Sequence, residues 1–341
     1  MAGTEAMNAA DRVRRPPGGP APRTLPPVPV PTPWRLTLAL AGVPGRLRAD
    51  YTAAAGLVAR RFLFGYPFAR LLTPPAWQPH LVTAIAFGAL ADDLVDAGTG
   101  QYAAEAFSRW AGHVRQALVS GQADQPELRA FLHTVAVRNV PHSAIHAYLA
   151  GQAARQQVGD YLTDQNHDDH IDQVLMPSGR IAYALCHRPG ERFPAETLRP
   201  VADATQRADD LSDLAVDLRR GRLTIPRTTL LHYGVQRADL ARRRDTPAVR
   251  AVLAHVRGRA RTALATARTA LADADPATQL LGWPALTGCE LVLAAAERRG
   301  TAVLSRHGLL RGIRPSPHGL IEGTLRTLHS SLRLAESDHD P

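Results

Sequence analysis

From Trp34 onward the chain repeats apolar residues with the period of an α-helix, and this pattern leaves little room for a sheet. Alanine, leucine and arginine dominate, and runs of β-branched residues are few. The sequence therefore predicts an all-α protein, a single bundle of about ten helices whose apolar faces turn toward a common interior. The periodicity predicts helices over 34–42, 47–72, 76–97, 101–120, 125–138, 141–163, 168–188, 195–220, 236–273, 276–299 and 316–336.

The two ends of the chain differ from this helical part. Residues 1–33 hold nine of the 27 prolines and almost no apolar periodicity, which predicts a disordered or polyproline-like tail. Residues 337–341 are predicted to form a short polar tail. One all-α domain over 34–336 remains between them.

The chain is strongly basic, with a formal net charge of +9, and all of its 40 basic residues are arginine. That charge suits an anionic partner such as nucleic acid, a membrane surface or a phosphorylated substrate. Many arginines are spread out, as over 242–268, which is typical of a solvated helix face. No zinc-finger spacing, aromatic RNA-binding signature or helix-turn-helix pattern occurs, so we expect no nucleic-acid binding. A peripheral contact with a membrane stays open.

Cysteine use and apolar runs bear on the compartment. Cys186 and Cys289 are too few for a disulfide framework and fit small core residues in a reducing cytoplasm. The longest apolar runs, such as 81–91, are shorter than the roughly 18 residues that span a bilayer. The first residues lack the basic-then-apolar order of a secretory signal. The sequence therefore predicts a soluble cytoplasmic protein.

The segment 206–226 (QRADDLSDLAVDLRRGRLTIP) crowds carboxylates onto one helix face. Within nine residues it places Asp209, Asp210, Asp213 and Asp217. Helical spacing puts them on overlapping stripes together with Gln206. Like charges four residues apart destabilise a helix by a few tenths of a kcal/mol per pair unless a cation lies between them. Because Mg²⁺ prefers carboxylate oxygens, it would convert this repulsion into ligation.

A second acidic cluster ends the helix predicted over 76–97. Asp92 and Asp96 share a face there, with Asp93 beside them. Negative charge is unfavourable at a helix C-terminus, where the negative end of the dipole already lies. An exposed acidic face balanced by arginines would explain one such pair. Two pairs on separate, otherwise apolar helices favour a functional site that binds metal.

Both segments resemble the squalene/phytoene synthase family, within the class I isoprenoid synthase fold. The stretch GYPFARLLTPPAWQPHLVTAIAFGALADDLVD (65–96) is similar to the family's first block, in which a Phe-containing segment and an LLP-like turn precede a helix ending in Asp-x-x-x-Asp. Segment 206–226 is similar to the second block, and 173–186 is a weaker match to the helix between them. The resemblance covers about half of the chain, roughly from Phe62 to Leu231.

The resemblance implies a class I isoprenoid synthase bundle that uses two or three Mg²⁺ ions. The implied catalytic aspartates, which bind these ions from two facing walls, are Asp92, Asp96, Asp213 and Asp217. Further candidate metal ligands are Asp93 and Asp209. Candidate substrate-binding residues are Phe68, Arg180, Tyr183, Gln206, Arg220 and Arg222. The implied substrate is a prenyl diphosphate, farnesyl or geranylgeranyl diphosphate.

Three positions depart from the family pattern. Ala89 and Ser212 stand where the family usually has arginines, and Asp209 stands where it usually has asparagine. Because arginines hold diphosphates, the departures favour an enzyme that ionises and cyclises a single C15 or C20 prenyl diphosphate. Head-to-head condensation of two prenyl diphosphates is the alternative. The alternative of another class is a non-catalytic basic helical protein that binds nucleic acid or membrane.

Two further segments allow both a structural and a functional interpretation. The histidines and aspartates of 166–172 (NHDDHID) lack a recognised metal-site spacing, so a helix start with an Asp cap is favoured. A glycine inside a helix, here Gly179, costs about 1 kcal/mol against alanine and suggests the close approach of a helix or ligand. Arg180 beside it is a diphosphate contact or a plain surface arginine. Core packing is the favoured role of Tyr183.

Overall fold

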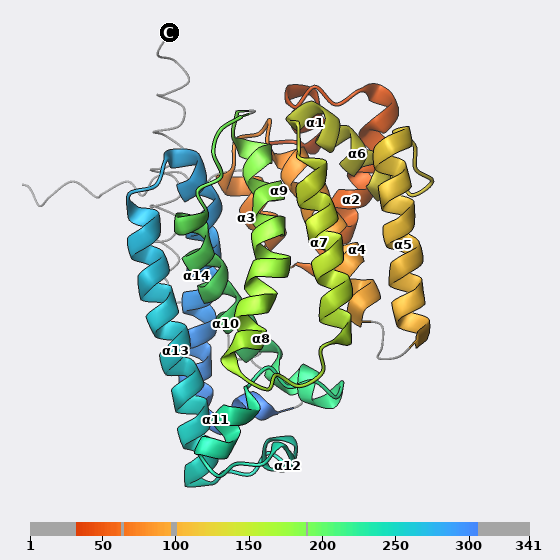
Figure 1. The fold of residues 1–341 in the computed structure, drawn as a ribbon. Helices are drawn as coiled ribbons and strands as arrows, with labels where there is room; N and C mark the ends of the chain where they lie inside the picture. The colour runs from red at the N-terminus through yellow and green to blue at the C-terminus, as the bar shows by residue number, and fades with distance from the viewer. Residues whose placement is uncertain (1–31, 63–64, 97–100, 189, 306–341) are drawn as a thin grey trace, which may run out of the picture. The chain divides into compact units, whose positions relative to one another are not determined.

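The computed structural model describes residues 32–62, 65–96, 101–188 and 190–305, and all regular structure in this part of the chain is helical (Figure 1). Its α-helices are α1 (Trp34–Leu40), α2 (Arg48–Arg61), α3 (Gly65–Leu72), α4 (Gln78–Asp96), α5 (Gln101–Ser120), α6 (Pro126–Arg138), α7 (His142–Gln157), α8 (Asp164–His170), α9 (Met176–Cys186), α10 (Ala195–Arg219), α11 (Arg227–His232), α12 (Arg237–Ala241), α13 (Pro247–Ala272) and α14 (Pro276–Arg299). Two short 3₁₀ segments, η1 (Gly45–Leu47) and η3 (Gly300–Leu304), and one π-helical segment, η2 (Ile171–Leu175), complete them. The predicted all-α class is confirmed.

Several predicted helices are divided in the structure. The helix predicted over 47–72 breaks at Phe62, whose backbone leaves the helical region at φ −115° and ψ 77°. The helix predicted over 236–273 breaks before α13, where Thr246 accepts a hydrogen bond from the amide of Val249 and Pro247 takes the first helical position. Residues 1–31 of the tail predicted over 1–33 lie outside the described residues, as do the predicted tail 337–341 and the predicted helix 316–336.

One aromatic cluster packs the helices α4, α5, α6, α7 and α9 together. The rings of Phe87 and Phe131 stack at a centroid distance of 4.1 Å, and Tyr148 packs 5.8 Å from Phe87. Buried aromatic pairs of this kind add about 0.5–1.5 kcal/mol beyond their area burial. This cluster therefore anchors α4, which carries the first pair of aspartates, against α7.

A second group of helices, α10, α13 and α14, packs through small side chains. Ala204, Ala208, Ala260 and Ala267 are buried along this seam, next to the apolar residues of α10. Small residues let helix axes approach closely, and α13 runs along α10 and α14 (Figure 1). The buried apolar residues thus form separate clusters, where the sequence predicted one common interior.

Both cysteines are free and buried, Cys186 in the first cluster and Cys289 in the second, as predicted. Among the described residues, Pro276–Leu304 is long and apolar enough to cross a membrane by length and composition alone. More than half of this window, 56%, is buried inside the fold, where α14 packs on α10 and α13. The stretch is therefore accounted for as a core helix, α14, which the sequence predicted over 276–299.

The π-helical segment between α8 and α9 packs tightly against α7. A Cβ atom on Gly151 would lie 1.8 Å from the backbone oxygen of Gln173 and 3.1 Å from Val174. Only glycine therefore allows α7 to approach this segment so closely. The approach fixes where the adjoining α8 presents its side chains, some of which line the site described below.

We predict that Gly151→Ala destabilises the protein by about 1–3 kcal/mol, because the backbone of the π-helical segment would have to move. Gly258→Ala, in the exposed middle of α13 with open space around the added methyl group, should leave stability unchanged or raise it by up to about 1 kcal/mol. Urea unfolding of both variants measures the difference. Equal stability of the two would contradict the close packing of α7.

Candidate active site

The two acidic clusters face a common pocket of about 200 Å³. Asp96, the last residue of α4, lies on one side, and four aspartates of α10 lie on the other. The aspartates of α10 that line the pocket are Asp209, Asp210, Asp213 and Asp217. Helices α7 and α8, the π-helical segment and the turn after α10 supply the rest of its lining. The structure thus brings together carboxylates that lie more than 100 residues apart in sequence.

Helix α10 presents its aspartates to the pocket because its other face is apolar. Leu211, Leu214 and Ala215 are buried and interleave with the acids. This apolar face packs on α13 and α14, so the acidic stripe must turn the other way. Arg219 at the last position of the helix complements the negative end of its dipole.

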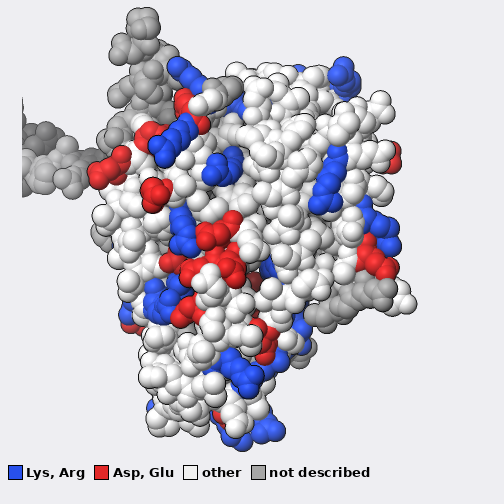
Figure 2. Space-filling view, in the orientation of Figure 1, with Lys and Arg blue, Asp and Glu red and all other residues white. Residues whose placement is uncertain are grey.

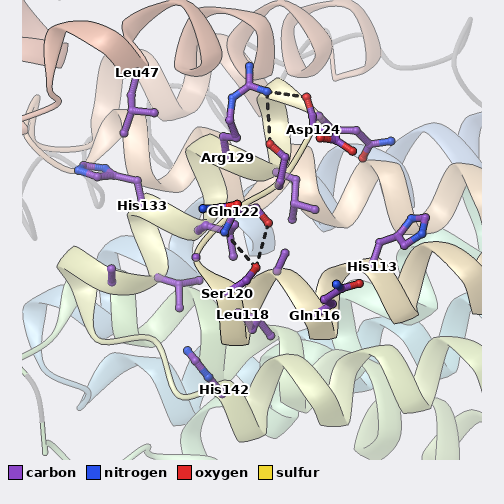
Figure 3. Close-up of a pocket in the computed structure, with 18 of the residues that line it drawn as sticks. Leu47, His113, Gln116, Leu118, Ser120, Gln122, Asp124, Arg129, His133 and His142 are labelled. Atoms are coloured by element: carbon purple, nitrogen blue, oxygen red, sulfur yellow. Dashed lines mark hydrogen bonds between the residues drawn. The ribbon is translucent and has the colours of Figure 1, made fainter.

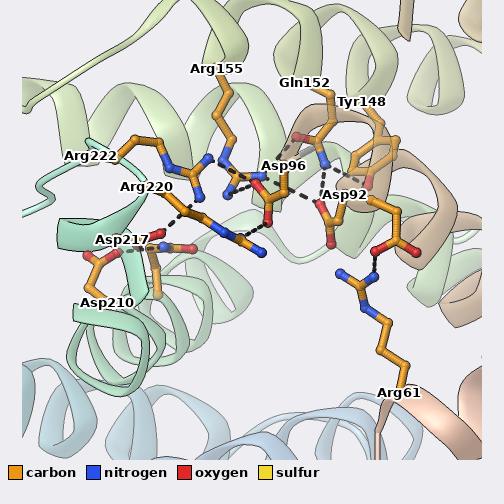
Figure 4. Close-up of polar contacts among 12 residues, drawn as sticks. Arg61, Asp92, Asp96, Tyr148, Gln152, Arg155, Asp210, Asp217, Arg220 and Arg222 are labelled. Carbon is orange, nitrogen blue, oxygen red and sulfur yellow. Dashed lines mark hydrogen bonds and ion pairs between the residues drawn. The ribbon is translucent and has the colours of Figure 1, made fainter. Parts of the chain in front are cut away.

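Two arginines that follow α10 bridge the acidic walls (Figure 4). One guanidinium nitrogen of Arg222 donates to Asp96 at 2.9 Å, and the other donates to Asp217 at 2.9 Å. Arg220 donates to the second oxygen of Asp96 at 3.3 Å. Of these predicted substrate-binding residues, Arg222 lines the pocket and neutralises carboxylates of both walls, and Arg220 reaches the pocket through Asp96.

The end of α10 aims Arg222 back at its own helix. Gly221 has a left-handed backbone with φ +84°, and its amide donates to the carbonyl oxygen of Leu218 at 3.4 Å. The amide of Arg222 donates to the carbonyl oxygen of Asp217 at 2.8 Å. These two bonds form a Schellman motif, for which glycine is the favoured residue at the left-handed position. The backbone turn therefore brings the Arg222 side chain to Asp217.

Helix α7 adds an arginine and a glutamine that sequence reasoning missed. The side-chain amide of Gln152 donates to Asp92 at 2.7 Å and to the hydroxyl of Tyr148 at 2.8 Å. Arg155 lies 3.6 Å from Asp92 and 3.6 Å from Asp96, so it lies between the two acids of α4 (Figure 4). The available signal was two polar residues three apart on a partly buried helix, which alone does not identify a partner.

The histidine-rich segment at 166–172 belongs to the site, although its predicted role was capping. A helix begins there, but its cap is Thr163, which forms a capping box with Asn166, so the expected Asp cap was wrong. His167 lies with one ring nitrogen 2.8 Å from Asp203 and the other 3.4 Å from Asp210. Burial lowers the pKa of His167, but its hydrogen bonds to these two aspartates raise it more, so the net shift is upward.

The remaining histidine of this segment stays neutral. His170 lines the pocket, and burial, followed by the nearby charge of Arg155, lowers its pKa to about 4. Among the predicted residues, Gln206 donates to Asp210 at 2.9 Å and also lines the pocket. The pocket therefore combines neutral polar groups with its opposed charges.

Crowding makes the carboxylates of the pocket hold protons more tightly. Burial raises the carboxyl pKa of Asp209, and the negative charges of Asp213 and Asp210 raise it further. The pKa of Asp213 is raised by burial and then by Asp217. Burial also raises the pKa of Asp92, against the opposing effect of Arg155. Since the side chains of Asp209 and Asp213 are open to the pocket, solvent screens part of this effect.

Five described residues of the predicted set do not line the pocket: Asp92, Asp93, Arg180, Tyr183 and Arg220. Asp92 and Arg220 lie next to it, because they contact Arg155 and Asp96 of its lining. Asp93 forms an ion pair with Arg61 of α2 (Figure 4), and the side chain of Phe68 in α3 lies outside the described part of the chain. The guanidinium carbon of Arg180 lies 4.4 Å from the ring centroid of Phe193. Tyr183 donates to the carbonyl oxygen of Arg192 at 3.1 Å and is buried, in agreement with the favoured core role.

The donor chemistry of the pocket fits Mg²⁺, because aspartates supply the oxygen ligands that this ion prefers. In the described part of the chain, no three Asp, Glu, His or Cys side chains converge on one point as a ligand group. The guanidinium groups of Arg222 and Arg220 lie between the carboxylates. Arginines thus supply the positive charge that the two walls need in this conformation.

A larger hollow lies elsewhere among the described residues, between α5, α6 and the loop that joins them (Figure 3). It has a volume of about 960 Å³ and is lined by His113, Arg129 and His133, among others. Arg129 is already bound to Asp50, 2.7 Å away. None of the residues predicted for catalysis, metal or substrate lines this cleft. Chemistry rather than size therefore identifies the candidate site.

Many other arginines are spread over the surface or paired with carboxylates. Figure 2 shows acidic side chains gathered near the middle of one face, with arginines at their border. Arg199 of α10 lies 2.8 Å from Asp172, and Arg207 lies 2.8 Å from Asp203. The exposed pair of Arg199 and Asp172 contributes about 0–1 kcal/mol.

Solved structures share the fold of this chain. The squalene synthase HpnC from Alicyclobacillus acidocaldarius matches with a TM-score of 0.64 and 26% identity, over 77% of this chain and 98% of that chain. A dehydrosqualene synthase in complex with ligand matches with a TM-score of 0.66 and 15% identity, over 86% and 98%. YisP from Bacillus subtilis matches with a TM-score of 0.57 and 15% identity, over 82% and 96%.

Sequence comparisons agree with the fold. The bifunctional protein CrtB/UppS of Streptomyces coelicolor is 27% identical over 218 residues, 62% of this chain, and the chain spans 38% of the length of that relative. The model of the squalene/phytoene synthase family matches residues 64–314. The chain belongs to the squalene/phytoene synthase family, whose members are prenyltransferase-type enzymes that act on isoprenoid diphosphates.

Proposed function

We propose that the chain is a Mg²⁺-dependent terpene synthase that ionises one C15 or C20 prenyl diphosphate, releases pyrophosphate and forms a terpene by cyclisation. The observation that carries the proposal is the meeting of two aspartate walls and three arginines at one pocket. The arginines are Arg155, Arg220 and Arg222. This combination suits a ligand with high negative charge held partly through metal.

The residues of the pocket match the demands of ionisation. When the bond between C1 and the diphosphate oxygen breaks, its electron pair leaves with the diphosphate, whose negative charge grows. Mg²⁺ bound by the aspartates would neutralise part of that charge. Arg155, Arg220 and Arg222 supply fixed positive charge beside the same pocket.

The prenyl chain of the substrate would lie toward the aromatic cluster formed by α4, α5, α6, α7 and α9. Tyr148 belongs to that cluster, and its hydroxyl accepts the hydrogen bond from Gln152, which also binds Asp92. Aromatic faces stabilise positive charge, and a dry interior keeps a carbocation away from water. The boundary between the acidic wall and the cluster therefore supports this placement of the prenyl chain.

Two observations favour one diphosphate over two. The pocket volume of about 200 Å³ is below the range of roughly 300–1,000 Å³ typical of ligand pockets, so a single head group suits it better. Ala89 is buried in α4, and Ser212 donates only a hydroxyl hydrogen bond, to Asp213. Neither position adds an arginine for a second diphosphate.

Head-to-head condensation of two prenyl diphosphates is the second candidate. It is supported by the 26% identity to the squalene synthase HpnC over nearly the whole length of that protein. Product length separates the two candidates, because condensation doubles the carbon number.

We predict that incubation with geranyl, farnesyl and geranylgeranyl diphosphates yields a C15 or C20 hydrocarbon or alcohol only with Mg²⁺ present. Asp213→Ala should lower the rate about a hundredfold or more, because it removes a proposed ligand of the metal. Asp245→Ala, which removes an exposed aspartate paired with Arg250, is the matched control and should keep wild-type activity. Mass spectrometry of the organic extract and a pyrophosphate assay give the readouts. A C30 or C40 product would favour condensation, and no pyrophosphate release from any substrate would refute both.

We also predict that Mg²⁺ together with pyrophosphate raises the melting temperature, and does so more at pH 8.5 than at pH 6. The raised pKa values of Asp209, Asp213 and Asp92 mean that the folded state holds protons more tightly than the unfolded state. Stability without metal is therefore lost as pH rises through the folded pKa values. Metal competes with these protons and gains affinity as they leave.

Thermal scans at both pH values test this prediction, with EDTA-treated protein as reference. Asp209→Asn should reduce the pH dependence of the metal-free protein, because it removes one of the crowded carboxylates. A Mg²⁺ effect independent of pH would contradict ligation by these aspartates. A nucleic-acid binder would not respond to Mg²⁺ and pyrophosphate and would instead be stabilised by DNA in a salt-dependent way.

A further inference from the structure

Helix α7 carries two polar side chains toward Asp92, and they differ in how firmly they are bound. Gln152 makes two short hydrogen bonds, at 2.7 Å to Asp92 and 2.8 Å to Tyr148. Arg155, one turn further along, lies 3.5 Å from the side-chain oxygen of Gln152 and 3.6 Å from each of Asp92 and Asp96. Distances above about 3.2 Å are long for hydrogen bonds from N–H to O. Arg155 is therefore held by charge rather than by committed hydrogen bonds.

Arg222, the other arginine among the residues that line the pocket, is committed, whereas Arg220 only contacts Asp96, at 3.3 Å, and does not line the pocket. Arg222 makes bonds of 2.9 Å to acids of both walls, and its own position is fixed by the turn after Gly221. Arg155 lines the pocket with a side chain that is 28% exposed, and it comes from α7, which carries neither acidic cluster (Figure 4). Its five N–H donors in a planar fork match the oxygens of a diphosphate.

Neither acidic helix offers an arginine of its own at this end of the pocket. Ala89, three residues before Asp92 on α4, is buried, and Ser212 on α10 hydrogen-bonds Asp213. Helix α4 packs directly on α7, so a cation for Asp92 and Asp96 arrives from the facing helix. Arg155 of α7 thus lies beside both acids of α4, while Asp96 is also paired with Arg220 and Arg222.

We propose that Arg155 binds the diphosphate of the substrate, and that Gln152 positions Asp92 beside it. The proposal rests on the proposed function. Asp92 and Asp96 would hold the metal, which would neutralise their charge, and the guanidinium of Arg155 would then be available to donate to the diphosphate oxygens. The same side chain thus serves as counter-charge without substrate and as anion ligand with it.

The test compares Arg155→Gln and Arg155→Lys with Arg199→Gln, which removes an arginine paired with Asp172 at the surface. Calorimetry with Mg²⁺ alone, and with inorganic pyrophosphate in the presence of Mg²⁺, measures the two binding steps. Arg155→Gln should bind pyrophosphate about tenfold or more weakly, Arg155→Lys should recover part of the loss, and Arg199→Gln should match the wild type. Mg²⁺ alone should bind Arg155→Gln as tightly as the wild type or more tightly, because a competing cation has gone. A merely structural role would weaken both steps together.

Two results would overturn the proposal. In one, Arg155→Gln and Arg155→Lys bind pyrophosphate as the wild type does while all three bind Mg²⁺, so that Arg155 is a counter-charge only. In the other, both variants lose Mg²⁺ and pyrophosphate binding to the same extent, so that the residue supports the fold of the wall. If the wild type itself binds no pyrophosphate with Mg²⁺, the proposed function fails, and that result is distinct from a defect confined to the variants.

Discussion

Repulsion between the carboxylates of α4 and α10 is the constraint on which the arrangement of this protein depends. Acids on two helices lie close enough to raise one another's pKa values, and three arginines hold them there. These arginines come from α7 and from the turn after α10, which the fold places beside the two acidic helices. The helices that line this polar centre belong to separate apolar clusters, α4 and α7 to one and α10 to another.

The helical class was predictable because apolar periodicity is a local property of the sequence. Most long helices lie close to their predicted ranges, including α5, α10 and α14. The breaks were harder to predict. Phe62 leaves the helix without a proline or glycine beside it, and the divided core depends on which helices meet. Such features arise from packing between distant segments, which a single sequence does not display.

The site was predictable to the extent that its residues repeat within one helix. The stripe from Asp209 to Asp217 is visible as spacing, and the structure turns all of it to the pocket. Arg155 and His167 could not be assigned, because their partners lie on other helices: Asp96 on α4 for the arginine, Asp203 on α10 for the histidine. A contact between residues far apart in sequence produces no pattern in the local spacing of residues. The family pattern named positions such as Ala89 but not what replaces them.

Arg222, in the turn at the end of α10, joins the two walls through one partner that is near in sequence and one that is distant. Arg222 is five residues from Asp217 and 126 residues from Asp96. Closing a short loop costs less chain entropy than closing a long one. The bond from Arg222 to Asp217 can therefore form together with the helix end, whereas the bond to Asp96 forms only once α4 has docked. The side chain of Arg222 is thus already held by Asp217 when its second partner, Asp96, arrives.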